Sequence, residues 1–176
     1  MGKLIAVAAL AAVTSASAIG VGISVHYNIG IPVGDFADTS KISVVGTLVD
    51  IEFRLHPFIN VVGAFGYQQF KPKDEIVGID KTTIIPIQFG VEYPAEFDKF
   101  AFYPGGGMSY NLIKTTIPGG DSDSENKIGA WFGGNFYYFV TPRILFGPSF
   151  HYHVIFTEPV RLGWIHIDFG VKYWFM

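Results

Sequence analysis

Hydrophobic and polar residues alternate with a period of two along most of this chain. In the stretch VDIEFRL (49–55), every second residue is apolar, and the residues between them are Asp50, Glu52 and Arg54. Neighbouring side chains of a β-strand point to opposite faces of the sheet. The alternation therefore predicts a strand with one apolar face and one charged face.

The same alternation recurs in eight stretches that are separated by turn-forming residues. We predict strands over residues 19–31, 42–55, 58–70, 82–93, 99–113, 127–140, 144–156 and 162–175. The connectors after the first, third and fifth strands are long and polar, and the longest is TTIPGGDSDSENK (115–127). The other connectors are short. Short turns at one end and longer loops at the other are typical of a transmembrane barrel of antiparallel strands.

The apolar faces of these stretches support this interpretation, because none of them carries a charged residue. Tyrosine recurs near both strand ends, and Phe53 takes its place once. These aromatic positions are Tyr27, Tyr67, Tyr110 and Tyr152 at one end, and Phe53, Tyr93, Tyr138 and Tyr173 at the other. Two aromatic girdles around an apolar band form the exterior of an outer-membrane barrel. The predicted fold class is all-β, an eight-stranded antiparallel up-and-down transmembrane β-barrel, since closure leaves no edge amides unpaired in lipid.

The composition and the N-terminus agree with a secreted membrane protein. The chain is 49% hydrophobic and only 15% charged, against a usual charged share of about 25%. Its one long apolar run, LIAVAALAAV (4–13), has about half of the ~20 residues that a membrane helix needs. Lys3 precedes this run and TSASA (14–18) follows it, as in a secretory signal. We therefore predict a signal peptide over 1–18 and a barrel domain over 19–176, rather than an N-terminal anchor helix.

Charge and cysteine content narrow the chemistry further. The net charge of −3 argues against nucleic acid as a partner. The absence of cysteine excludes disulfides and a lipid-modified N-terminal cysteine. The sequence also lacks the G-x-S-x-G, H-E-x-x-H and glycine-rich phosphate motifs, so we expect no enzymatic activity and no cofactor.

The C-terminal sequence FGVKYWFM (169–176) ends in alternating apolar residues. The chain resembles the small eight-stranded outer-membrane barrels, which include the membrane domain of OmpA, OmpX and the opacity and porin-like proteins. In that group, alternating apolar residues that end in an aromatic are the signal read by the barrel-assembly machinery. The matching residues here are Phe169, Val171, Tyr173 and Phe175, and Met176 displaces the terminal aromatic by one position. YNIGIPVGDFAD (27–38) also resembles the first strand and loop of the group.

The resemblance implies a location in a bacterial, Gram-negative-type outer membrane. The partners it implies are outer-membrane lipid and lipopolysaccharide, together with the barrel-assembly machinery and periplasmic chaperones. We expect a monomer.

Charged residues on the inward faces predict a closed interior. Eight strands enclose a space just wide enough for side chains to fill, so an open pore is not expected. Buried charges need partners. We predict an ion-paired plug near the periplasmic strand ends, formed by Asp50, Glu52, Arg54, Glu92 and Lys172. This plug is either a static polar core or a gate that opens when its charges exchange partners.

Four histidines and one aspartate also share the inward register. This lumen cluster consists of His26, His151, His153, His166 and Asp168. If paired residues of the last two strands sum to 319, His151 faces Asp168 and His153 faces His166, and barrel closure brings His26 beside Asp168. Hydrogen-bonded lumen residues are the simpler interpretation. The alternative is a site that changes protonation between about pH 5 and 7 or binds zinc weakly; we assign no metal ligand.

Three prolines, Pro86, Pro104 and Pro148, lie inside predicted strands, where each removes a ladder hydrogen bond. Simple bulges are the favoured interpretation. In the resembling OmpW and PagP barrels, interrupted pairing opens lateral windows for apolar molecules. The predicted function is therefore a structural and surface barrel with a plugged lumen. The alternatives are an OmpW-like carrier of small hydrophobic molecules through a lateral opening and, less favoured, a lipid-modifying enzyme.

Overall fold

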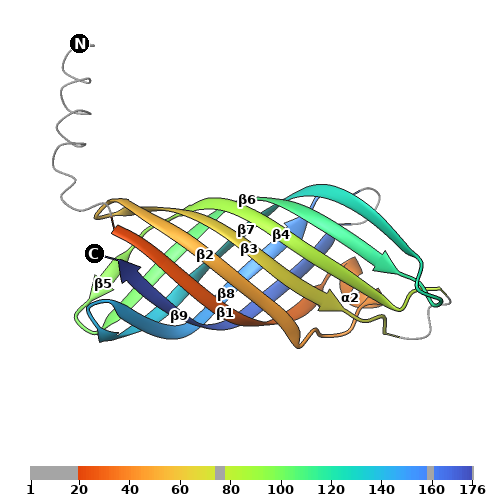
Figure 1. The fold of residues 1–176 in the computed structure, drawn as a ribbon, viewed down its shortest axis with the longest axis horizontal. Coiled ribbons are helices and arrows are strands. Elements are labelled where there is room, and N and C mark those ends of the chain that lie inside the picture. Colours follow the sequence, from red (N-terminus) through yellow and green to blue (C-terminus); the bar gives the residue numbers. More distant parts are fainter. Residues whose placement is uncertain (1–19, 74–77, 158–160, 176) are drawn as a thin grey trace, which may run out of the picture.

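The computed structural model describes residues 20–73, 78–157 and 161–175, and these form one closed antiparallel sheet (Figure 1). The elements are β1 (Gly20–Val33), α2 (Asp35–Thr39), β2 (Val45–His56), β3 (Ile59–Phe70), β4 (Lys81–Glu92), β5 (Ala95–Phe97), β6 (Phe100–Thr116), β7 (Ser122–Thr141), β8 (Ile144–Ile155) and β9 (Leu162–Phe175). Each barrel strand pairs with its sequence neighbours, β4 pairs with β6, and β1 pairs with β9. The predicted eight-stranded up-and-down barrel is confirmed; the three-residue β5 only extends one turn along β6. The predicted signal peptide, 1–18, lies outside the described residues.

The two ends of the barrel differ. Both described chain ends and the connections after β2, β4 and β7 lie at one end, which we call the turn end; Figure 1 shows it beside β5. The opposite end carries α2 and the connections after β1, β3, β6 and β8, and we call it the loop end. Helix α2 was not predicted. It follows Gly34, whose positive φ of 59° suits glycine, and it buries Phe36 in the barrel mouth.

The third long connector was predicted wrongly. Residues 115–127 are mostly strand, because β6 and β7 continue their ladder beyond the apolar band to the pair Thr116–Ser122. The connection is only residues 117–121, with Gly119 and Gly120 at positive φ. These added pairs join polar, largely exposed residues, so hydrophobic alternation gives no sign of them.

The predicted assignment of faces is confirmed along all eight barrel strands. The residues of the apolar register point outward, and none of them is buried; Phe89 and Phe100, for example, are 65% and 62% exposed. The polar residues between them point inward and are buried, apart from the half-buried Arg54. Soluble proteins rarely expose so large a continuous apolar surface. An apolar band around a closed barrel with polar contents is the arrangement that crosses a bilayer.

No helix in the described part of the chain is long and apolar enough to cross a membrane.

The predicted register of the last hairpin was wrong by two residues. Paired positions of β8 and β9 sum to 317, so His151 pairs with His166 and His153 pairs with Trp164. A slip of one residue would move every side chain to the other face, but a slip of two leaves all faces unchanged. The hydrophobic pattern therefore could not distinguish 317 from 319.

Candidate functional site in the barrel lumen

The lumen contains three layers of side chains. An apolar layer fills the turn end and consists of Ala101, Tyr103, Tyr137, Leu145 and Trp174. A second apolar layer fills the loop end and consists of Phe36, Phe70, Ile84, Ile113, Ile155 and Trp164. Most of the buried polar side chains lie between these layers, whereas Arg54 and Lys172 contact Tyr103 and Trp174 of the turn-end layer itself. Because α2 contributes Phe36 to the loop-end layer, the first loop helps to close that mouth.

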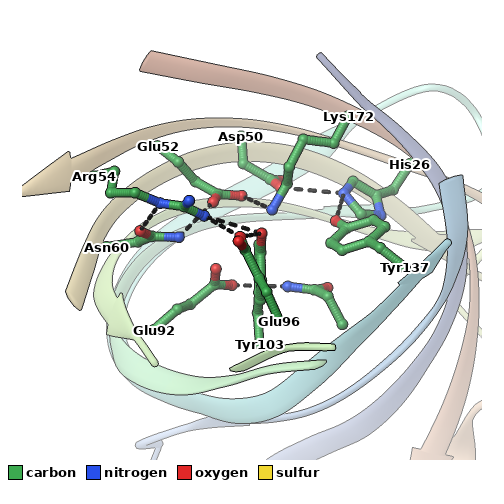
Figure 2. Close-up of polar contacts among 11 residues, drawn as sticks. His26, Asp50, Glu52, Arg54, Asn60, Glu92, Glu96, Tyr103, Tyr137 and Lys172 are labelled. Carbon is green, nitrogen blue, oxygen red and sulfur yellow. Dashed lines mark hydrogen bonds and ion pairs between the residues drawn. The ribbon is translucent and has the colours of Figure 1, made fainter. Parts of the chain in front are cut away.

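The centre of the charged layer is an ion pair between Lys172 of β9 and Glu52 of β2 (Figure 2). Both side chains have no exposed surface. The Lys172 ammonium also lies 4.4 Å from the ring centroids of both Tyr103 and Tyr137. Such cation–π contacts strengthen when the cation is removed from water. Lys172 is therefore held by one carboxylate and two aromatic faces.

A second ion pair lies nearer the turn end. Arg54 donates from Nη2 to Oε1 of Glu96 at 2.6 Å, and the Tyr103 hydroxyl donates to the same oxygen at 2.5 Å. The Arg54 guanidinium also lies 4.6 Å from the centroid of Trp174. The pair is partly exposed, since its side chains retain 26% and 37% of their surface. It forms the solvent-facing side of the charged layer.

Asn60 links these two ion pairs, while Glu92 lies apart from them. Asn60 accepts from Arg54 Nε at 3.4 Å and donates to Glu52 Oε2 at 3.1 Å. Glu92 accepts a 2.7 Å hydrogen bond from the amide of Asn135. Figure 2 shows the side chains of this group projecting into the barrel.

Of the five residues predicted to form an ion-paired plug, Lys172 and Glu52 pair with each other, and the other three have partners outside the set. Arg54 pairs with Glu96, Glu92 bonds to an amide, and Asp50 lies 3.1 Å from Nε2 of His26. Glu96 was missed because it belongs to β5, in a segment predicted to be a turn. The inward-facing Tyr103 and Tyr137 were also missed. Each directly follows a phenylalanine of the outward face, and this alternation was a usable signal. That the plug blocks passage stays a prediction.

The predicted histidine cluster is divided into separate contacts. Nδ1 of His151 lies 3.1 Å from the carboxylate of Asp168. The two residues are diagonal neighbours on β8 and β9, whereas the prediction had them directly paired. The ring of His153 stacks on Trp164 at 5.0 Å and lies 4.3 Å from that of His166. His26 was predicted to lie beside Asp168, but its carboxylate partner is Asp50, because β2 provides the nearer acid on its other side. Within the described residues, no three histidine or acidic side chains are placed to hold a metal ion.

Little space remains in the middle of the lumen. A pocket there measures about 10 Å³ and lies between Leu48, Asp50, Val62, Ala64, Gln88, Glu92, Trp131, Asn135 and His151. A cavity needs roughly 10–15 Å³ to hold one water molecule. This pocket therefore has room for about one water molecule.

The three in-strand prolines affect the ladder differently. Pairing continues on both sides of Pro104 up to the end of β4. The β3–β4 ladder lacks two pairs at Pro86, and the β7–β8 ladder lacks two at Pro148. Neither gap changes the register, so the predicted bulges at the prolines were wrong. Register shifts occur instead near the turn end, at residues 54–56 of β2 and 139–141 of β7.

The gap at Pro148 is accompanied by a groove on the lipid-facing side. The groove measures about 230 Å³ and is lined by Phe100, Ala101, Phe136, Tyr137, Tyr138, Phe146, Gly147, Pro148 and Phe169. Although hydrogen bonds are missing, the two strands remain in close contact. A Cβ atom added at Gly147 would clash with the carbonyl oxygen of Phe136. The wall is thus weakened here without being open.

The four residues of the predicted assembly signal lie on the outward face of β9, and each is exposed. Met176 lies outside the described residues. Recognition by an assembly machinery stays a prediction.

Comparisons with known proteins agree with the geometry. No protein-family model matches the sequence, and no curated protein is significantly similar to it. Among solved structures, Neisserial surface protein A superimposes with a TM-score of 0.66 at 17% identity, covering 90% of this chain and 98% of that one. The attachment invasion locus protein Ail of Yersinia pestis, in complex with the heparin analogue sucrose octasulfate, superimposes with a TM-score of 0.60 at 17% identity, covering 89% of this chain and 100% of that one. A major outer membrane protein of Thermus thermophilus superimposes with a TM-score of 0.61 at 13% identity, covering 88% of this chain and 99% of that one. The chain has the fold of the small eight-stranded barrels of bacterial outer membranes.

Proposed function

We propose that this protein is a structural and surface barrel of the bacterial outer membrane whose filled lumen does not conduct. The observation that carries the proposal is the packing of side chains inside the barrel. Two apolar layers enclose a charged layer, and a pocket in its middle measures only about 10 Å³. An ion crossing the barrel would have to displace the buried Lys172–Glu52 pair and aromatic side chains at both ends.

The orientation follows from the unequal ends. In outer-membrane barrels, short turns face the periplasm and longer loops face outward. The loop end, with α2, is then the surface that meets other molecules. Two of the structurally similar proteins are a surface protein and an attachment protein, which is consistent with such a role. Lipopolysaccharide and outer-membrane lipid are the partners that we propose for this surface.

We propose no enzymatic activity for this barrel. Two His–Asp contacts lie in the lumen, His26–Asp50 and His151–Asp168. Hydrolysis by such a pair needs a nucleophile within hydrogen-bond reach of the histidine. In the described part of the chain, no serine hydroxyl is hydrogen-bonded to either histidine, and the hydroxyl that lies 3.5 Å from Nε2 of His26 is the phenol of the buried Tyr137.

A second candidate is a carrier of small hydrophobic molecules through a lateral opening, and the groove at Pro148 favours it. The groove is lined mainly by apolar side chains and reaches the inward-facing Tyr137. An opening there requires β7 and β8 to separate by more than the contact at Gly147 allows. A carrier would retain an apolar molecule during purification, and lipid mass spectrometry would reveal it.

We expect reconstitution into planar bilayers to give no sustained single-channel current, because the filled lumen that we propose has no continuous path for water. The control is the Lys172→Ala, Arg54→Ala double variant, which removes both cations and several contacts at the turn end. This variant is expected to conduct intermittently. Sustained channels in the parent protein would contradict the proposed filled lumen.

A further inference from the structure

Three lysines lie next to one another on the outward face of the barrel at its loop end. Lys114 is the last lysine of β6, Lys81 begins β4, and Lys71 immediately follows β3. The pairs Phe70–Thr82 and Thr83–Lys114 bring the three together on adjacent strands. Continuing the β3–β4 ladder by one residue places Lys71 opposite Lys81. Lys114 is the diagonal neighbour of Lys81 on β6. We call these three residues the lysine patch.

The patch has no acidic partner within the described structure. None of its lysines forms an ion pair there. Described acids near the patch include Asp80, which precedes Lys81, and Asp123 and Glu125, which flank the Lys114 partner Ser124 on the inward register; Glu125 pairs with Lys127. On the outward face of β7, the residues beside Lys114 are Ser122, Ser124 and Asn126. Like charges on neighbouring strand positions destabilise a sheet unless an anion offsets them.

The height of the patch on the barrel indicates where that anion lies. Lys71 and Lys114 each follow a girdle tyrosine by four residues, Tyr67 and Tyr110 respectively. Four residues of a strand advance roughly 13 Å, and strands in such barrels are tilted by about 40°. The ammonium groups thus lie just beyond the aromatic girdle, at the level of lipid headgroups. They also share the face that carries the lipid-exposed Phe65 and Met108 lower on the same strands.

The rest of the loop-end circumference differs in character. The outward residues at the ends of β8, β9 and β2 are apolar, for example Phe156, Ile165 and Val45. Single exposed cations lie beside β2 (Lys41) and β9 (Arg161), whereas three neighbouring lysines occur together over β3, β4 and β6.

We propose that the lysine patch binds the phosphate groups of an anionic lipid in the leaflet that surrounds the loop end. A lipid with two phosphate groups fits best, because three cations spaced over adjacent strands contact more than one phosphate. The inference rests on the proposed function, since it requires the loop end to lie at the outer leaflet. A soluble polyanion is the less suitable ligand, because the patch faces the bilayer side of the wall rather than the open mouth.

The test compares two double variants of the full mature chain in phosphatidylcholine nanodiscs that contain a small fraction of bisphosphorylated lipid A. Lys81→Gln with Lys114→Gln removes two charges of the patch. Lys99→Gln with Arg143→Gln removes two exposed charges at the turn end and serves as the matched control. Bound lipid A is measured by native mass spectrometry, and a mass shift between unheated and heated samples in SDS confirms that each variant is folded.

Each basic residue near an anionic membrane surface contributes enough for about a fivefold change in binding. The patch variant is expected to bind lipid A roughly 10- to 30-fold more weakly than the parent. The control is expected to bind as the parent does, and neither millimolar phosphate nor sucrose octasulfate should displace the lipid. Equal binding by the folded patch variant and the parent would overturn the proposal. So would equal loss in both variants, or displacement by sucrose octasulfate, which would assign the patch to a soluble polyanion. Failure of the parent to show the heat-dependent shift would instead contradict the barrel itself.

Discussion

Replacing Lys172 by methionine is expected to lower the free energy of unfolding by about 3–5 kcal/mol, since the change leaves Glu52 as a buried charge without its cation. Methionine preserves most of the side-chain length, so the loss of packing against Tyr103 and Tyr137 is small. The pair has no exposed surface, and water cannot replace the missing ammonium. The measurement is the urea midpoint for unfolding from lipid vesicles, followed by the heat-dependent shift in SDS.

Two controls separate charge from volume. Adding Glu52→Gln to the methionine variant removes the unpaired buried charge and retains an acceptor for Asn60. This second change should restore most of the lost stability. Methionine at the exposed Lys99 should change stability by less than about 0.5 kcal/mol. A Lys172→Met protein as stable as the parent would show that Glu52 is not buried beside it.

Replacing Phe150 by arginine should cost roughly 2–4 kcal/mol, because this side chain points outward near the middle of β8 and meets the centre of the bilayer. The matched control is Phe156→Arg. Phe156 is outward-facing to a similar extent, but it follows β8 at the loop end, where the cost of arginine falls to about 0–1 kcal/mol. The urea midpoints of the two variants in the same vesicles give the comparison. Equal losses would mean that β8 does not cross the bilayer in this register.

Period-two alternation was sufficient to predict the barrel, because a strand has only two faces. In β2 the pattern correctly placed Val49 and Ile51 outward and Asp50 and Glu52 inward. It could not determine which inward residue meets which, because that depends on register and on the shear of the closed sheet. His26 illustrates this: its face was predicted correctly, and its partner was not.

The residues that sequence reasoning missed lie where alternation stops. Phe36 closes the loop-end mouth from a five-residue helix inside a polar connector, and Glu96 completes an ion pair from a predicted turn. Phe36 was detectable in principle, as the one aromatic residue in the polar segment 32–41. Glu96 gave no such signal, since an acid in a turn is ordinarily solvated.

The central claim is that a closed barrel shows an apolar face to lipid and a polar face to its own interior, and neighbouring single cysteines test it most directly. The natural chain contains no cysteine, so every labelled thiol is an introduced one. In lipid vesicles, a membrane-soluble maleimide should label Val25→Cys and Phe150→Cys, and should leave their inward neighbours Ser24→Cys and Ser149→Cys unlabelled. All four should react after unfolding. Labelling of Ser149→Cys as fast as Phe150→Cys in the folded protein would contradict the account.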